Sequence, residues 1–307
     1  MKNKIAVLLA LLITLPLTAC GTQTGEDKNM ETSSETSVQT SSAGSQTSSA
    51  ASAAADAEYT TEKAEFFRDG LKISGELLLP ESDEPMPLVI LSHGLGGNRY
   101  IVKDYAQTFA QNGIAAYIFD FIGGGVSIDS DGKTMDMSVL TEAADLNAIL
   151  EGLKADPRFD KEKIFLFGES QGGFVSTYVA CERPEDIAGL AVLYPGYVIR
   201  DSVIETIPNL DNLPETMTIL GTPLGRIYAQ DALSVDIYDM MKDYDKKVLI
   251  IHGTADSIVP LSYSERAAEE FPDCELIKLE GADHGFKGDD KTTAAQAALE
   301  YVQSMMK

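Results

Sequence analysis

Short apolar runs alternate with helical patterns through most of this chain, and the alternation restricts the folds that it can adopt. Such runs are nearly continuous in apolar residues, which is typical of strands buried on both faces. The expected strands are 87–94, 114–121, 163–168, 187–195, 246–253 and 275–281. The expected helices are 100–112, 138–155, 171–182, 263–271 and 291–306. Strands joined through helices indicate an α/β fold, with a mainly parallel, doubly wound sheet covered on both faces.

Two segments depart from this alternation. Residues 65–80 alternate in polarity on both sides of Asp69-Gly70, and this dipeptide favours a two-residue turn, so we expect an antiparallel hairpin at one sheet edge. Residues 197–245 contain three prolines and no strong strand pattern. We interpret 197–245 as a cap inserted over the carboxyl ends of the strands, where open α/β sheets bind ligands.

The N-terminus has the pattern of an export signal. Lys2 and Lys4 precede a 13-residue apolar run, 5–17, which is short for a bilayer span and typical of a secretory signal. The sequence LTAC follows and ends at Cys20, which resembles the bacterial lipoprotein signal. We expect residues 1–20 to be a signal peptide and Cys20 to be lipidated, anchoring the protein to the cell membrane on its extracytoplasmic side. A soluble secreted protein with an incidental cysteine is the alternative.

Residues 21–58 consist mainly of Ser, Thr, Ala, Gly, Gln and acidic residues, and the first aromatic residue of the mature chain is Tyr59. Such a segment cannot build a core, so we expect a disordered tether. The folded domain is then 59–307.

Composition excludes several classes of partner. The net charge of −24, with no Lys/Arg block, disfavours nucleic acid. Three scattered histidines have no metal-ligand spacing, and the glycine run 123–125 continues into no nucleotide-binding motif, so we expect neither metal nor cofactor. The sequence does not indicate whether Cys181 and Cys274 pair, nor the oligomeric state.

The motif Gly168-Glu169-Ser170-Gln171-Gly172 lies at an expected strand-to-helix junction. This is the G-x-S-x-G pattern in the context where it presents a serine hydroxyl above the sheet. An ordinary turn with a solvated serine is the alternative. We expect Ser170 to be a catalytic nucleophile.

A serine hydroxyl needs a base to accept its proton. His284 lies in GADHGF after the last expected strand, and Asp256 lies in HGTADSIVP after the preceding one. The order Ser170, Asp256, His284 is the order of this type of triad. Asp283 is the rival acid, and we rank it below Asp256 because neighbouring side chains point apart in extended loops.

Acyl transfer also needs donors for the oxyanion. We expect the backbone N–H groups of Leu95, in the loop HGLGGN, and of Gln171 to supply them. His93 and His252 follow strands and are expected to shape loops.

The motifs HGLGGN, DFIGGGVS, GESQGG, HGTADSIVP and GADHGF resemble the α/β-hydrolase superfamily over about residues 60–307. The chain is most similar to bacterial cinnamoyl and feruloyl esterases, through the glycines after the serine and through the cap. This resemblance implies Tyr228 as a substrate contact and Asp201 as a weaker one. A glutamine that the family can carry in the cap is absent, with Pro208 near its place, and Glu169 stands where histidine is frequent.

These features predict a serine carboxylesterase acting on small to medium acyl or aryl-acyl esters, with a feruloyl or cinnamoyl ester as one substrate. A serine peptidase of the prolyl-peptidase type would use the same triad. A non-catalytic binding lipoprotein would need neither the triad nor the oxyanion loop.

Overall fold

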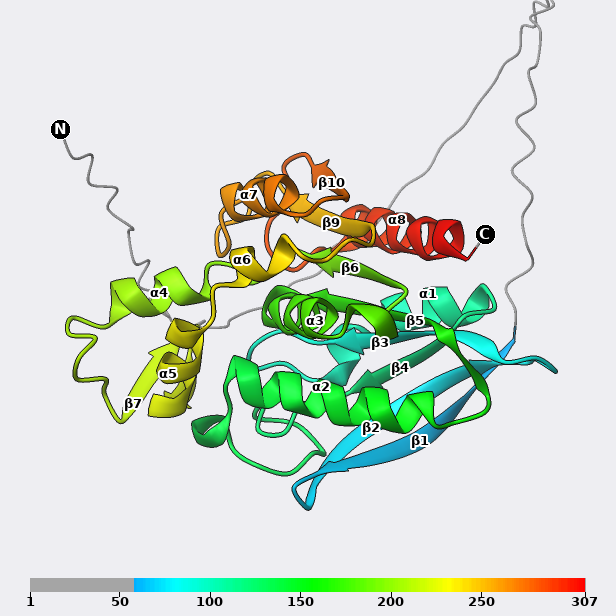
Figure 1. Cartoon of the computed structure of the whole chain (residues 1–307), viewed down its shortest axis with the longest axis horizontal. Helices are drawn as coiled ribbons and strands as arrows, with labels where there is room; N and C mark the ends of the chain where they lie inside the picture. Colours follow the sequence, from blue (N-terminus) through cyan, green and yellow to red (C-terminus); the bar gives the residue numbers. More distant parts are fainter. Residues whose placement is uncertain (1–57, 307) are drawn as a thin grey trace, which may run out of the picture. The chain divides into compact units, whose positions relative to one another are not determined.

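The structure is a computed structural model that describes residues 58–306, in which a central sheet lies between two layers of helices (Figure 1). The eight strands have the order β1-β2-β4-β3-β5-β6-β9-β10. β2 pairs antiparallel with β1 and β4, whereas the other neighbours are parallel. The strands are β1 Tyr59–Arg68, β2 Leu71–Pro80, β3 Met86–Ser92, β4 Ala115–Phe119, β5 Phe159–Glu169, β6 Gly189–Leu193, β9 Val248–Gly253 and β10 Cys274–Leu279. The predicted fold class, a mainly parallel sheet with an N-terminal antiparallel hairpin, is confirmed.

The turn between β1 and β2 has a local cause. Asp69 and Gly70 have φ angles of 53° and 82°. Both central residues of a type I′ turn need positive φ, which aspartate tolerates and glycine adopts freely. The turn therefore sets the register in which Arg68 faces Leu71.

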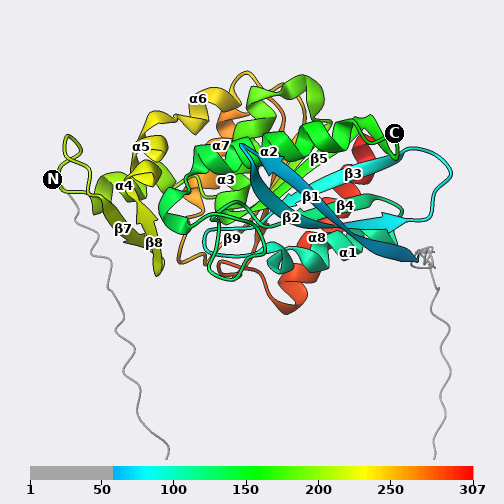
Figure 2. The same cartoon turned by 90° about the horizontal axis from the view of Figure 1, so that it is seen from below.

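Helices cover both faces of the sheet (Figures 1 and 2). One face packs against α1 and α8, and the other against α2, α3 and α7. Their bounds are α1 Lys103–Gln111, α2 Val139–Lys154, α3 Ser170–Glu182, α7 Ser262–Glu270 and α8 Gly288–Met305. Short 3-10 turns occupy Arg99–Ile101, Thr134–Asp136 and Pro184–Asp186.

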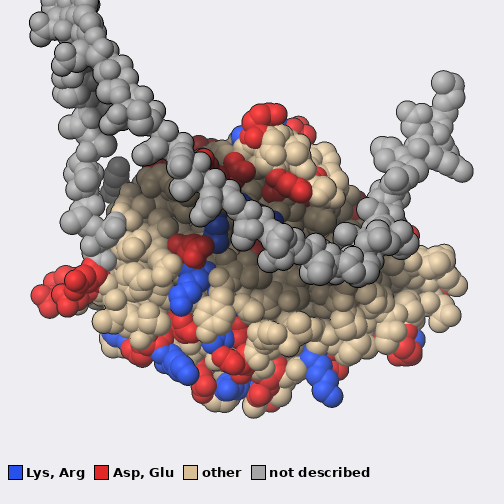
Figure 3. Space-filling view, turned by 180° about the vertical axis from the view of Figure 1, so that it is seen from behind, with Lys and Arg blue, Asp and Glu red and all other residues tan. Residues whose placement is uncertain are grey.

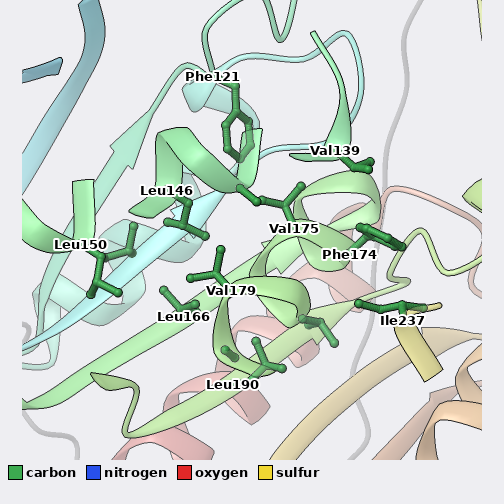
Figure 4. Packing of buried hydrophobic residues seen from close by; sticks show 14 of the residues in the cluster. Phe121, Val139, Leu146, Leu150, Leu166, Phe174, Val175, Val179, Leu190 and Ile237 are labelled. Carbon is green, nitrogen blue, oxygen red and sulfur yellow. The ribbon is translucent and has the colours of Figure 1, made fainter. Parts of the chain in front are cut away.

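Helix α3 is buried over most of its surface, unlike an amphipathic surface helix (Figure 4). Phe174, Val175 and Val179 are at most 2% exposed and pack in one cluster with Leu146 of α2 and Leu166 of β5. Truncating one such side chain to alanine typically costs about 2–5 kcal/mol. This packing holds the helix whose first residue is Ser170.

Residues 197–245 lie between β6 and β9 and contain α4 Ile199–Thr206, β7 Thr216–Ile219, β8 Thr222–Gly225, α5 Arg226–Ser234 and α6 Ile237–Met241. The sequence pattern indicates no strand there, but β7 and β8 form a two-stranded hairpin. Each of these strands has only four residues, too few for a clear alternation. Leu220 and Gly221 make its turn, with φ angles of 48° and 80°.

The predicted signal peptide, lipidated Cys20 and most of the predicted tether lie outside the described residues. None of the helices within 58–306 combines the length and apolar character needed to cross a membrane. Cys181 and Cys274 are free thiols in the structure.

Candidate active site

The tight turn between β5 and α3 raises Ser170 above the sheet edge. Ser170 has φ = 50°, a left-handed conformation that is unusual for a residue with a side chain. A Cβ on Gly168 would lie 2.3 Å from the Gly172 oxygen, and one on Gly172 would lie 2.4 Å from the Ser92 oxygen. Only glycines therefore allow the strand, the turn and the helix to approach this closely.

Three loops bring a hydroxyl, an imidazole and a carboxylate into a line. Ser170 Oγ lies 3.1 Å from His284 Nε2, and His284 Nδ1 lies 2.8 Å from Asp256 Oδ2. The three residues follow β5, β10 and β9 at the carboxyl ends of these parallel strands. Within hydrogen-bond distance the imidazole can accept the serine proton while the carboxylate holds its other nitrogen.

The carboxylate of Asp256 is buried and fully engaged. Its Oδ1 accepts hydrogen bonds from the N–H groups of Ile258 and Val259, at 2.9 and 2.8 Å. His252 Nε2 lies 3.3 Å from its Oδ2. Burial alone would raise the pKa of Asp256, but hydrogen bonds from the two imidazoles and from the Val259 N–H hold this pKa well below its usual range. The group is therefore charged wherever the fold persists near neutral pH.

Asp283, the rival acid, turns away from the imidazole ring. Its Oδ1 accepts hydrogen bonds from Ser257 N, Ser257 Oγ and His284 N at 2.8, 2.9 and 2.7 Å. These bonds connect the two loops that carry Asp256 and His284. Asp283 thus contacts the His284 backbone, whereas Asp256 contacts its ring.

The other two histidines are buried and support loops. His252 Nε2 lies 2.9 Å from the Val259 carbonyl, which can only accept, so this nitrogen carries the proton and Nδ1 accepts from Ser264 Oγ. His93 Nε2 accepts from Phe121 N at 3.2 Å, so its Nδ1 donates to the Gly94 carbonyl at 2.8 Å. Burial lowers the pKa of His93, which favours this neutral form.

The predicted oxyanion donors, Leu95 and Gln171, line the same cavity as Ser170. Gln171 is the second residue of α3, where a helix leaves its N–H groups without intrahelical acceptors. Within residues 58–306 the Leu95 N–H donates to no backbone carbonyl. A Cβ on Gly94 would lie 3.1 Å from the Ser170 Cβ, so glycine allows this loop to approach the hydroxyl.

The cavity beside Ser170 encloses about 510 Å³, including its open mouth. Its wall is mainly apolar and comes from both the sheet loops and the segment 197–245. The lining residues are Leu95, Ser170, Gln171, Gly196, Val198, Ile199, Ser202, Ile219, Leu220, Tyr228, Ile258 and Val259. None of them carries a charged side chain.

The two substrate contacts implied by resemblance have different positions. Tyr228 of α5 lines the cavity, and its hydroxyl donates to Gln171 Oε1 at 2.7 Å. Asp201 of α4 is exposed, accepts a hydrogen bond from Tyr263 at 2.9 Å and borders a separate hollow. The structure therefore places Tyr228 beside Ser170, whereas Asp201 lines the separate hollow and not the cavity.

Sequence reasoning missed a buried carboxyl group behind this wall. Glu142 of α2 is 1% exposed, and Gln171 Nε2 donates to its Oε2 at 2.7 Å. Burial raises the pKa of Glu142 well above its usual value, although the hydrogen bond from Gln171 opposes this. Glu142, Gln171 and Tyr228 connect α2, the serine turn and α5. A polar residue in a helix gives no signal of such a contact.

On the face of the molecule shown in Figure 3, Lys and Arg side chains are interspersed with Asp and Glu, so positive charge is not concentrated there. Within residues 58–306 no three His, Cys, Asp or Glu side chains cluster so that they could hold a metal ion.

The comparisons with known proteins agree with this architecture. A family model described as "Serine aminopeptidase, S33" matches residues 83–236, half of the chain, and one described as "TAP-like protein" matches 231–305. An uncharacterized protein of Mycobacterium tuberculosis is 27% identical over 199 residues, which are 65% of this chain and 63% of that protein. Monoglyceride lipase of Rattus norvegicus is 25% identical over 52% of each chain. The chain thus spans one half to two thirds of the length of these curated relatives.

Among solved structures, Est1E from Butyrivibrio proteoclasticus with bound ferulic acid superposes with a TM-score of 0.73 at 24% identity, covering 79% of this chain and 99% of Est1E. A monoacylglycerol lipase from Paleococcus ferrophilus superposes with a TM-score of 0.57 at 22% identity, covering 76% of this chain and 99% of that chain. These superpositions show a shared fold. By its strand order and by the matching family model, the chain belongs to the α/β-hydrolase superfamily, in the family described as serine aminopeptidase, S33.

Proposed function

We propose that this α/β hydrolase is a serine carboxylesterase that cleaves neutral esters of small to medium acyl groups through an acyl-enzyme on Ser170. The observation that carries the proposal is the line of hydrogen-bond distances from Ser170 Oγ through His284 to Asp256. A hydroxyl, a base and an orienting acid in this order are the parts that nucleophilic acyl transfer requires.

In this mechanism His284 Nε2 takes the Ser170 proton as Oγ attacks the ester carbonyl. The N–H groups of Leu95 and Gln171 donate to the oxyanion of the tetrahedral intermediate. His284 then returns the proton to the leaving alcohol, which departs and leaves the acyl group on Oγ. A water molecule repeats the sequence, releasing the acid and restoring the serine.

The cavity supports an ester substrate over an aminopeptidase substrate. The free amino terminus of a peptide is a cation, and burying it without a carboxylate partner is unfavourable. The cavity lining contains no charged side chain, and most of its residues, such as Ile199 and Ile219, are apolar. A neutral apolar acyl group fits this wall.

Relatives suggest which esters to test first. Est1E was solved with ferulic acid, and the rat relative is a monoglyceride lipase. Hydroxycinnamoyl esters and monoacylglycerols are therefore the two natural classes that we propose to compare with simple aliphatic esters. Prolyl and aminoacyl amides represent the peptidase alternative.

The test uses the full chain in detergent with a fluorophosphonate probe. We expect labelling and p-nitrophenyl butyrate hydrolysis to disappear in Ser170→Ala. Ser234→Ala is the matched control, because Ser234 is an exposed serine at the end of α5 and does not line the cavity, and it should retain both. Labelling that survives Ser170→Ala, or faster turnover of aminoacyl amides than of every ester, would overturn the proposal.

We also propose that the enzyme acts outside the cytoplasm, anchored to the membrane through lipidated Cys20. The signal-like sequence before Cys20 supports this, and two acyl chains suffice for stable anchoring. Metabolic labelling with a palmitate analogue should modify the wild-type chain and not Cys20→Ser. Equal labelling of both, or an unlabelled wild type, would refute the anchor.

A further inference from the structure

A second buried carboxyl group lies next to the nucleophile, and the mechanism above does not use it. Glu169 is the last residue of β5 and is 6% exposed. It precedes α3, but its side chain makes no capping hydrogen bond to that helix. Carboxyl groups are seldom buried without a partner, so the contacts of Glu169 need an explanation.

The partner of Glu169 is Tyr194, which follows β6. The Tyr194 hydroxyl donates to Glu169 Oε2 at 2.7 Å. The ring of Tyr194 lies against the His284 ring, with centroids 4.5 Å apart, and against Phe286 at 4.7 Å. Glu169 therefore touches the ring that supports the face of the catalytic imidazole.

The backbone of Tyr194 is also held in an unusual position. Its φ of 36° is in the left-handed region, although it carries a bulky side chain. Its N–H donates to the Ile251 carbonyl of β9 at 2.8 Å. Residues with such strain persist only where surrounding contacts determine their position, and these sites concentrate around active centres.

The charges around Glu169 come from four elements. Burial raises the pKa of Glu169, while the Tyr194 hydrogen bond, the positive charges of His284 and Lys291 and a hydrogen bond from the Gly94 backbone lower it. Burial and the negative charges of Glu169 and Asp104 raise the pKa of Tyr105 of α1, and Asp104 pairs with Lys291 at 2.5 Å. Asp256 lies beyond the imidazole and acts on Tyr194 as well. His284 and Lys291 are thus the two groups whose positive charge acts on Glu169.

We propose that Glu169 is a positioning residue for His284: it holds the ring in place through Tyr194 and supplies a second negative charge that stabilises the imidazolium. This role rests on the proposed function, because in that reaction the imidazolium forms when the serine proton moves to Nε2. Asp256 orients the ring through Nδ1, whereas Glu169 holds it through the packed ring of Tyr194. The presence of glutamate before the nucleophile then has a physical reason.

The first experiment measures His284 without any substrate. Histidine-labelled full chain, wild type and Glu169→Gln, is titrated by NMR, and the pH at which the His284 imidazole takes up its proton is compared. Removing a nearby negative charge makes the protonated ring less stable, so this midpoint should fall by roughly 0.5–1 pH unit. Glu269→Gln is the charge-matched control, because Glu269 is exposed on α7, and its midpoint should equal that of the wild type.

The second experiment measures the acid limb of kcat/KM for p-nitrophenyl butyrate. In Glu169→Gln this limb should move to lower pH by the same amount, and kcat should fall about threefold to tenfold. Tyr194→Phe keeps the ring against His284 but removes the hydroxyl, so its limb should move in the same direction by less. If Glu169 had a purely structural role, the two substitutions would lower thermal stability, and the acid limb of kcat/KM would stay in place in both variants.

The outcomes separate the two proposals. An unchanged midpoint in Glu169→Gln, with the variant folded, overturns the role of Glu169 even if ester hydrolysis is intact. A wild type that hydrolyses no ester overturns the proposed function, while the substrate-free titration still decides whether Glu169 acts on His284.

Discussion

Replacing Asp256 by asparagine tests the site most directly, because the structure dictates how the amide would be oriented. Oδ1 of Asp256 accepts two backbone N–H bonds, from Ile258 and Val259. An amide oxygen can keep both bonds only if it takes the place of Oδ1, which leaves the NH₂ group facing His284 Nδ1 and gives up only the longer contact with His252 Nε2, at 3.3 Å. The opposite orientation would place two N–H donors against the NH₂ group, and each lost hydrogen bond costs about 0.5–1.5 kcal/mol.

The favoured orientation gives the wrong imidazole tautomer. With NH₂ donating to Nδ1, the proton of His284 must move to Nε2, and Nε2 can then no longer accept the Ser170 proton. A change of this kind lowers kcat by about 10⁴-fold in the protease that serves as the reference case. That factor corresponds to about 5.5 kcal/mol of transition-state stabilisation.

The assay is kcat/KM for p-nitrophenyl butyrate at neutral pH, with thermal unfolding to verify the fold. Asp283→Asn is the matched control, because Asp283 bonds the His284 backbone and not its ring, and its kcat should stay within about tenfold of the wild type. The reasoning is refuted if Asp256→Asn keeps more than a tenth of the activity, or if Asp283→Asn loses more than Asp256→Asn.

Three further predictions concern the fold and the cavity. Burial raises the pKa of Asp145 to about 6, against hydrogen bonds that lower it. Between pH ~4 and ~6 the folded state therefore keeps a proton on Asp145 that the unfolded state has released. As pH rises through this window, the loss of that proton should lower the free energy of unfolding by up to ~3 kcal/mol. In urea unfolding, the stability of Asp145→Asn relative to the wild type should increase from pH 4 to pH 7. A difference in the free energy of unfolding that stays constant over this range would contradict the prediction. A Cβ at Gly172 would lie 2.4 Å from the Ser92 oxygen, so Gly172→Ala should lower the free energy of unfolding by about 1–3 kcal/mol and reduce probe labelling. A variant that melts at the same temperature as the wild type would contradict this prediction. Ile219→Trp should fill the cavity and reduce hexanoate turnover more than acetate turnover. The control is Ile204→Trp, because Ile204 is exposed on the same segment 197–245, and it should leave the ratio of hexanoate to acetate turnover unchanged. Equal ratios in the two variants would mean that Ile219 does not contact the acyl chain.

Local patterns in the sequence were sufficient for the features that depend on neighbours in the chain. Asp69-Gly70 predicted the hairpin turn because the required φ angles are a property of these two residue types. The apolar runs and helical periods predicted the parallel sheet because burial on two faces needs a continuous apolar run. The G-x-S-x-G pattern placed Ser170 at a strand-to-helix junction, where the structure has it.

Contacts between distant segments were beyond this kind of reasoning. The sequence could rank Asp256 above Asp283, but only the fold shows which carboxylate reaches the His284 ring. The resemblance implied Asp201 as a weaker substrate contact, yet in the structure Asp201 lines a separate hollow.

The residue types and their order along the chain therefore decided the class of fold and the set of groups available for chemistry, because propensity, turn geometry and hydrophobic period act over a few residues. The tertiary structure alone decided which of these groups meet. Glu142 reaches Gln171, and Glu169 reaches Tyr194 behind His284, only because the packed sheet and helices bring together segments that are far apart in the sequence.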